Sequence, residues 1–128
     1  MQLRRYRAED LPILAHLFGE TVRRVNSRDY APPQVQAWAA GEADLLTRDS
    51  WFQRLYTLVA EADGRIVGYG NVDDTGYLDH LFVRWDCQGQ GIATALCDAL
   101  EAHCRELGVD AVTVHASKTA LPFFLHRG

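Results

Sequence analysis

The chain has 128 residues, of which 48% are hydrophobic and 23% are charged, and its formal net charge is −4. That length supports one domain, residues 1–128, with its own core and without stabilising disulfides. The negative charge provides no general attraction for nucleic acid or anionic lipid, so we expect neither a nucleic-acid nor a membrane partner.

In chain order, the first expected elements are a short strand, Gln2–Arg7, and an amphipathic helix. Glu9 and Asp10 place carboxylates where a helix N-terminus favours them. Apolar residues then recur at helical spacing, which predicts one buried stripe. The stripe consists of Leu11, Leu14, Leu17, Phe18, Val22 and Val25.

A turn at Asn26–Pro33 ends this pattern, because proline and small polar residues interrupt helices. Pro33 is suited to the first turn of a second helix that continues to about Ala40. The segment Gly41–Ser50 has no clear pattern, and a short helix is expected around Trp51–Leu55.

The middle of the chain predicts three consecutive antiparallel strands. Tyr56–Glu61 and Arg65–Val72 are rich in strand-forming residues and flank Asp63-Gly64, a strong hairpin turn. A second turn at Asp73–Gly76 leads to the third strand, Tyr77–Arg84.

The pattern then becomes helical over Gly91–Leu107, and Gly108 follows as a C′ residue that ends the helix. Val109–His115 alternates apolar and polar residues and predicts a strand, after which Ser117 is placed to cap a final helix ending near His126. A strand, a helix and a strand in this order form a βαβ unit with parallel strands. The predicted fold class is therefore α/β, with a mixed sheet that combines an antiparallel meander and a parallel pair.

The three cysteines, Cys87, Cys97 and Cys104, have no CxxC spacing and suit a reducing compartment. Cys97 and Cys104 lie seven residues apart on one predicted helix, as small core residues would. The sequence supplies no histidines at a spacing that would complete a metal site with them. It also shows no secretory signal and no apolar run long enough to span a membrane. We therefore expect a cytoplasmic protein that binds no metal.

The segment most informative about function is Gln88–Ala93, which joins a strand to an amphipathic helix. Its glycines allow the backbone to turn sharply and to approach a ligand closely. The unpaired N–H groups and the dipole at the start of the helix attract an anion such as a pyrophosphate. The segment lacks the lysine of a P-loop and the third glycine of a dinucleotide-binding fingerprint. The residue pattern of this segment alone is equally compatible with a simple glycine-rich turn that binds no ligand.

Two segments resemble motifs of a known family. Leu81–Ala93 resembles the central motif of the GNAT superfamily of N-acetyltransferases, a strand followed by Q/R-x-x-G-x-G/A, and Gln88, Gly91 and Ala93 match its defining positions. Ala120–Gly128 resembles the later A-x-x-F-Y-x-x-x-G motif of the family. The resemblance, which extends over most of the chain, implies that an amine acceptor attacks the thioester of acetyl-CoA directly and takes its acetyl group.

The resemblance also implies how acetyl-CoA, the expected cosubstrate, would bind. Backbone amides of the loop would hold the pyrophosphate, the backbone of Val83 would pair with the pantetheine arm, and Leu81 N–H would face the thioester carbonyl. The implied cofactor-binding residues are Leu81, Phe82, Val83, Gln88, Gly89, Gln90, Gly91, Ile92, Ala93, Thr94, Ser117 and Phe124.

The expected general base is Asp79 or His80, because both lie on the strand that leads into the loop. Adjacent strand residues face opposite ways, so at most one of them points into the site. Tyr77 and a water relay are alternatives. Phe124 stands where the family often has a tyrosine that acts as general acid. Another group or solvent would then protonate the thiolate, or it would leave unassisted.

The acceptor is expected near the connection between the first two helices, where Arg28, Tyr30 and Trp38 lie, although Trp38 also suits a core position. Phe124 and the short C-terminus also favour a second function, a catalytically weak acetyl-CoA-binding sensor or partner-binding module. A structural domain that binds no nucleotide is a third possibility.

The family usually continues beyond the glycine matched by Gly128 with two further strands. Without them, the strand at Val109–His115 would have an unpaired edge that invites pairing with another chain. We therefore expect the sequence to be a fragment of a longer protein or to form a homodimer through this edge.

Overall fold

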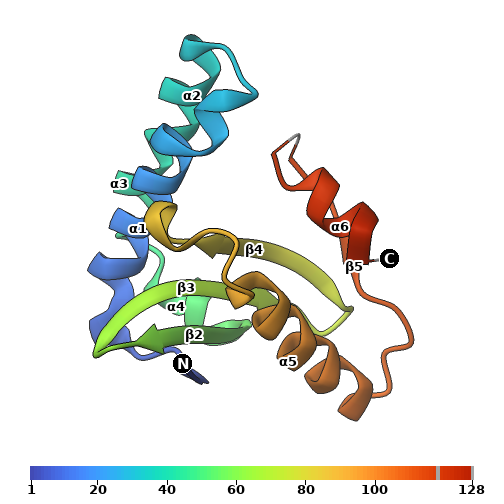
Figure 1. The fold of residues 1–128 in the computed structure, drawn as a ribbon. Helices are drawn as coiled ribbons and strands as arrows, with labels where there is room; N and C mark the ends of the chain where they lie inside the picture. The colour runs from blue at the N-terminus through green and yellow to red at the C-terminus, as the bar shows by residue number, and fades with distance from the viewer. Residues whose placement is uncertain (118, 128) are drawn as a thin grey trace.

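The computed structural model describes residues 1–117 and 119–127, and at its centre is a five-stranded sheet with the order β1-β2-β3-β4-β5 (Figure 1). The strands are β1 (Gln2–Arg5), β2 (Tyr56–Ala62), β3 (Arg65–Val72), β4 (Tyr77–Val83) and β5 (Thr113–Val114). The first four strands pair antiparallel, and β5 is parallel to β4. The predicted mixed α/β sheet, with its meander and its parallel pair, is confirmed.

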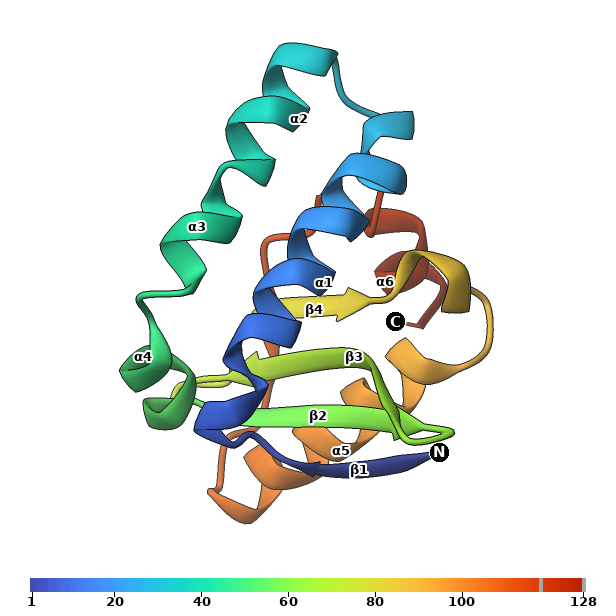
Figure 2. The ribbon, with the colours of Figure 1, turned by 90° about the vertical axis from the view of Figure 1, so that its left-hand side faces the viewer.

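Helices cover both faces of this sheet. They are α1 (Leu11–Arg24), α2 (Pro32–Ala39), α3 (Gly41–Leu45), α4 (Asp49–Arg54), α5 (Ile92–Glu106) and α6 (Leu121–Arg127). Figure 2 shows the helices α1 to α4 on one side of the strands and α5 on the other. Because neighbouring strand residues face opposite ways, Val59 packs with α1 while Leu58 packs with α5.

The spacing of apolar residues predicted the two amphipathic helices, α1 and α5, correctly. All six residues of the predicted stripe, five on α1 and Val25 directly after it, are buried, and Cys97 and Cys104 of α5 are buried as expected of core residues. The second helix begins at Pro32, one residue earlier than predicted, and the unassigned segment that follows contains α3. Strand β1 ends at Arg5, because Arg7 N–H already donates to Asp10 Oδ2 at the start of the first helical turn.

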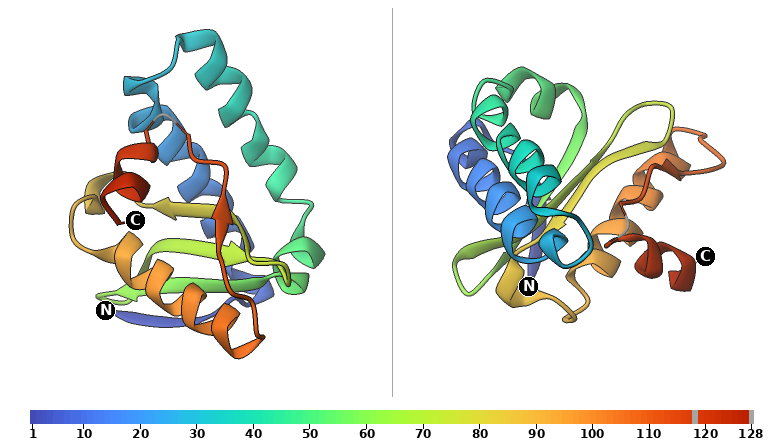
Figure 3. Two further views of the ribbon diagram at one scale, coloured as in Figure 1. Left: turned by 90° about the vertical axis from the view of Figure 1, so that its right-hand side faces the viewer. Right: turned by 90° about the horizontal axis from the view of Figure 1, so that it is seen from above.

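Strand β5 is much shorter than the predicted Val109–His115. Val109 N–H donates to Cys104 O at 2.9 Å, so this residue completes the end of α5 instead of a strand. The pairing of β5 with β4 consists of Tyr77 with Thr113 and Leu78 with Val114. Figure 3 shows the β5 segment crossing near the start of β4. The remainder of β4 therefore has an edge that β5 does not cover.

In the part of the chain that the structure describes, no helix has the length and apolar character needed to cross a membrane. The same part contains no group of three or more His, Cys, Asp or Glu side chains arranged to hold a metal ion. β5 is the last strand in the order of the sheet. Pairing of its outer edge with a second copy of the chain, in a homodimer, stays a prediction.

Candidate functional site

A bulge interrupts β4 beside the site. Asn71 pairs with His80 and Val72 pairs with Leu78, so Asp79 is an extra residue without a partner on β3. The side chain of Asn71 holds the bulge, because its Oδ1 accepts the backbone N–H of His80 at 2.9 Å. The bulge changes the alternation of side chains along β4. Both Leu78 and Leu81 consequently pack on the α5 side of the sheet.

After the bulge, one edge of β4 points away from β3. Arg84 N–H donates to Val67 O on β3 at 2.8 Å. Val83 O points the other way and accepts hydrogen bonds from Thr21 Oγ1 at 3.1 Å and from Gln88 Nε2 at 2.7 Å. Because backbone groups alternate along a strand, the N–H groups of Val83 and of Leu81 also face this outer edge.

The loop between β4 and α5 turns through two glycines with left-handed backbone. Gly89 has a φ of 73° and Gly91, the N-cap of α5, has a φ of 81°. In the described chain, no heavy atom beyond the adjacent residues lies within 4 Å of a Cβ built at either glycine. Glycine suits these positions because other L residues rarely adopt such a φ. The first turn of the fifteen-residue α5 is thus left open to an anion.

A cavity of about 440 Å³ lies between this loop, β4, the end of β5 and α6. Its volume is within the range of roughly 300–1,000 Å³ that small-molecule sites occupy. Most of the predicted site residues line it: Asp79, Leu81, Phe82, Val83, Gln88, Gly89, Gly91, Ile92, Ala93, Thr94, Ser117 and Phe124. His80 and Gln90 are the two predicted residues that do not line this cavity.

Asp79 is the only carboxylate among the described lining residues. Burial raises the pKa of Asp79 above that of an ordinary aspartate, and the negative charge of Asp73 raises it further, while the positive charge of Arg48 opposes both. A carboxylate with a raised pKa is a stronger base than a solvated aspartate. Asp79 thus lines the cavity as an exposed carboxylate with a raised pKa, and its role as a base stays a prediction.

His80 lies on the other face of the sheet, beneath α1 and α4. Its ring stacks on Phe18 with a centroid distance of 5.8 Å and meets Trp51 edge-on at 4.9 Å. Its Nδ1 is hydrogen-bonded to Tyr69 Oη at 3.0 Å. Burial, with a smaller contribution from the charge of Arg48, lowers the pKa of His80 to about 4. His80 is therefore a neutral, packed side chain at neutral pH.

We expect His80 to make folding stability depend on pH. Its pKa falls from 6.5 to about 4 on folding, so the unfolded chain binds more protons between these values and stability rises with pH across this window. Urea unfolding at pH 4.5 and at pH 7 should show a stability loss in acid that is about 2 kcal/mol smaller in His80→Gln than in the wild type. His16→Gln, at an exposed histidine, is the control. Equal losses in all three proteins would contradict the packed, neutral state of His80.

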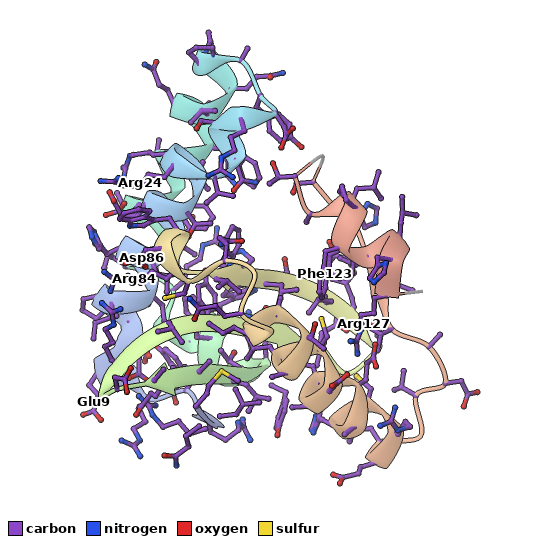
Figure 4. All side chains as sticks on the ribbon, viewed as in Figure 1. Glu9, Arg24, Arg84, Asp86, Phe123 and Arg127 are labelled. Atoms are coloured by element: carbon purple, nitrogen blue, oxygen red, sulfur yellow. The ribbon has the colours of Figure 1, made fainter. Side chains whose placement is uncertain are left out.

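Helix α6 forms one wall of the cavity. It is attached to α5 through Arg127, whose guanidinium lies 2.7 Å from Asp98 and 2.8 Å from Glu101. Figure 4 shows Phe123 and Arg127 on the side of α6 nearest α5. Ser117 Oγ accepts the N–H of Ala120 at 3.1 Å in the turn before α6, so Ser117 lies ahead of the helix, which begins at Leu121, and is not its cap residue. The two motifs singled out in the sequence thus meet across one cavity.

Several lining residues were not predicted from the sequence. Thr21 and Asn26 are buried polar residues at the end of α1 and just after it. Thr21 lies four residues after Leu17 and so falls on the apolar face of the helix. A polar residue on that face was the sequence feature that could have indicated a site residue. Trp38 lines the cavity and also packs against Tyr30 with a ring centroid distance of 5.5 Å. Trp38, unlike Thr21 and Asn26, was named in the sequence analysis; it packs against its neighbours and also faces the cavity, and its contact with an acceptor stays a prediction.

Comparison with known proteins identifies the class to which this fold and cavity belong. The family model described as "Acetyltransferase (GNAT) domain" matches residues 26–128. An uncharacterized N-acetyltransferase of Escherichia coli (strain K12), YafP, is 32% identical over 131 residues, covering all of this chain and 80% of that protein. The chain therefore belongs to the GNAT family of N-acetyltransferases.

Solved structures agree with this assignment. A GCN5-related N-acetyltransferase from Rhodopseudomonas palustris, also described as "Aminotransferase, Class-II", is 32% identical, with a TM-score of 0.95 over 99% of this chain and 79% of that one. The PaiA N-acetyltransferase of Thermoplasma acidophilum, in complex with coenzyme A, is 17% identical, with a TM-score of 0.80 over 98% of this chain and 86% of that one. The second likeness supports the fold alone.

Proposed function

We propose that this protein transfers the acetyl group of acetyl-CoA to a primary amine of a small molecule or peptide. The observation that carries the proposal is the convergence of three features on one cavity: the glycine loop, the uncovered edge of β4, and Asp79. Membership of an acetyltransferase family supports the donor, and the coenzyme A complex of PaiA provides a precedent in the same fold.

The residues present fit acetyl-CoA. The open backbone at Gly89 and Gly91, together with the N-terminus of α5, would hold the pyrophosphate through N–H groups. Among the described lining residues there is no arginine or lysine, so these N–H groups and the helix dipole would carry that interaction. The N–H of Val83 would bond the pantetheine arm along the β4 edge, with Ser117 and Phe124 on the opposite wall.

The bound donor would supply an activated acetyl thioester. An amine with an ordinary pKa of about 10 is protonated at neutral pH and must lose a proton before it attacks. Asp79 would take that proton, directly or through a water molecule. The nitrogen would then bond to the carbonyl carbon while Leu81 N–H stabilises the negative charge on its oxygen. The carbon–sulfur bond would break, the nitrogen would release its second proton to solvent to form the amide, and coenzyme A would leave as a thiolate that solvent protonates.

A binding and a turnover measurement test this proposal together. Acetyl-CoA at a hundred times its dissociation constant should stabilise the fold by about 2.7 kcal/mol in a thermal or urea titration. Release of free coenzyme A thiol should then appear with at least one member of a panel of amines, peptides and aminoglycosides. An absence of any acetyl-CoA effect on stability would remove the proposed donor.

Phe124 favours one alternative, a catalytically weak acetyl-CoA-binding sensor or partner-binding module. It lines the cavity where the family often has a tyrosine, and its ring offers no proton to a departing thiolate. Acetyl-CoA binding without thiol release for any amine in the panel would favour this module over the enzyme.

A further inference from the structure

A second cavity, of about 140 Å³, adjoins the first between α5, β5 and α6. Cys97, Leu100 and Val112 belong to its wall alone, whereas Leu78, Val114 and Phe124 line both cavities. These three apolar side chains therefore form a wall that the two cavities share and that stands between them. Leu78, one residue of this wall, directly precedes the bulge at Asp79 and lies on the same side of the sheet as Leu81.

The second cavity suits an uncharged hydrocarbon group. Its charged lining residues are Glu101 and Arg127, which pair with each other at 2.8 Å, and Arg127 also pairs with Asp98 at 2.7 Å. The guanidinium is thus already matched by two carboxylates and is not available for an acidic ligand. Burial raises the pKa of the Cys97 thiol to about 11, so this side chain is neutral as well.

The size of the cavity allows several carbon atoms. An apolar cavity of roughly 150 Å³ stays dry and binds a molecule as large as benzene. Leu78, Val114 and Phe124 line the first cavity together with Leu81, so an acyl group whose carbonyl is held at Leu81 N–H would lie in the space that these side chains bound. Phe124 is half-buried on α6, which has no fully buried residue, so a longer acyl group would have to displace only a partly packed side chain to reach the second cavity.

We propose that the second cavity holds the tail of an acyl group longer than acetyl, and that short unbranched acyl-CoA thioesters such as butyryl-CoA are donors for this protein. This inference rests on the proposed function, because it uses the same binding site for the coenzyme A portion. In the reaction, the carbonyl carbon of the butyryl group would form a bond to the amine nitrogen, and its bond to sulfur would break, as in acetyl transfer.

Calorimetric titration of the full chain with acetyl-CoA and butyryl-CoA tests the inference without a known acceptor. Each buried methylene is expected to tighten binding by roughly fourfold, so butyryl-CoA should bind up to about fifteenfold more tightly than acetyl-CoA. Val112→Phe, which fills the second cavity, should abolish this preference and leave acetyl-CoA affinity within about twofold. Val109→Phe is the matched control, because Val109 packs in the same core cluster outside both cavities.

The outcomes separate this inference from the proposed function. A butyryl-CoA preference that Val112→Phe abolishes and Val109→Phe retains supports the acyl cavity. Equal or weaker binding of butyryl-CoA, alongside measurable acetyl-CoA binding, overturns the inference and leaves the proposed function intact. A preference that survives in Val112→Phe with an unchanged melting temperature also overturns it, because the tail then lies elsewhere. Failure of both thioesters to bind overturns both proposals.

Discussion

Gly91→Glu is expected to weaken acetyl-CoA binding by at least about a hundredfold while the chain stays folded. The substitution places a carboxylate in the open space at the start of α5, where we propose that the pyrophosphate binds. Two like charges about 6 Å apart repel by roughly 3 kcal/mol at an effective dielectric constant of 20, which corresponds to about a hundredfold in affinity. Calorimetric titration with acetyl-CoA measures the loss.

Gly64→Glu is the matched control for this experiment. Gly64 has a φ of 78° and, like Gly91, has no described atom beyond its adjacent residues within 4 Å of the position that a Cβ would take, but it lies in the β2–β3 hairpin turn. Both variants carry the same backbone strain and the same added charge. Only Gly91→Glu should lose binding, and unchanged acetyl-CoA affinity in that variant would refute the loop as the pyrophosphate site.

Asp79→Asn is expected to lower the rate of acetyl transfer by about a hundred- to ten-thousand-fold, with little change in acetyl-CoA affinity. A general base typically contributes a factor of this size, and it acts on the acceptor and not on the donor. Because the pKa of Asp79 is raised, the acidic limb of the wild-type pH–rate profile should lie above the ordinary aspartate value of about 3.9. The rate should rise with pH through that limb, and the limb should disappear in the variant.

Two further variants are controls for the Asp79→Asn experiment. Asp74→Asn removes an exposed carboxylate from the turn before β4 and should leave both rate and pH profile unchanged. His80→Gln should also retain the acidic limb, because the histidine packs on the opposite face of the sheet. A wild-type rate and limb in Asp79→Asn would show that water or another group removes the proton.

Much of the fold was predictable because it depends on local periodicity and on turn residues. Helical spacing identified α1 and α5, and Asp63-Gly64 identified the β2–β3 hairpin, whose residues do adopt positive φ. The end of α5 was also predictable from Gly108, but the extent of β5 was not. Apolar alternation over Val109–His115 does not reveal that Val109 N–H is already used by the helix cap.

The candidate site was predictable where a motif fixes the backbone and unpredictable where distant elements meet. The loop from Gln88 to Thr94 followed from its glycines and its position before a helix. The bulge at Asp79 did not, because it depends on the side chain of Asn71 on the neighbouring strand. Simple alternation therefore established that Asp79 and His80 face different ways without establishing which one enters the cavity.

The attachment of α6 links the ionic environment to the affinity of the site. This helix supplies Phe123 and Phe124 to the cavity wall, yet it has no fully buried residue, and the ion pairs of Arg127 with Asp98 and Glu101 help hold it on α5. Salt screens partly exposed pairs of this kind, so we expect them to hold α6 against α5 less firmly as ionic strength rises. Because apparent affinity scales with the fraction of molecules whose site is complete, we expect even the uncharged part of a ligand that contacts Phe123 and Phe124 to bind more weakly at high salt.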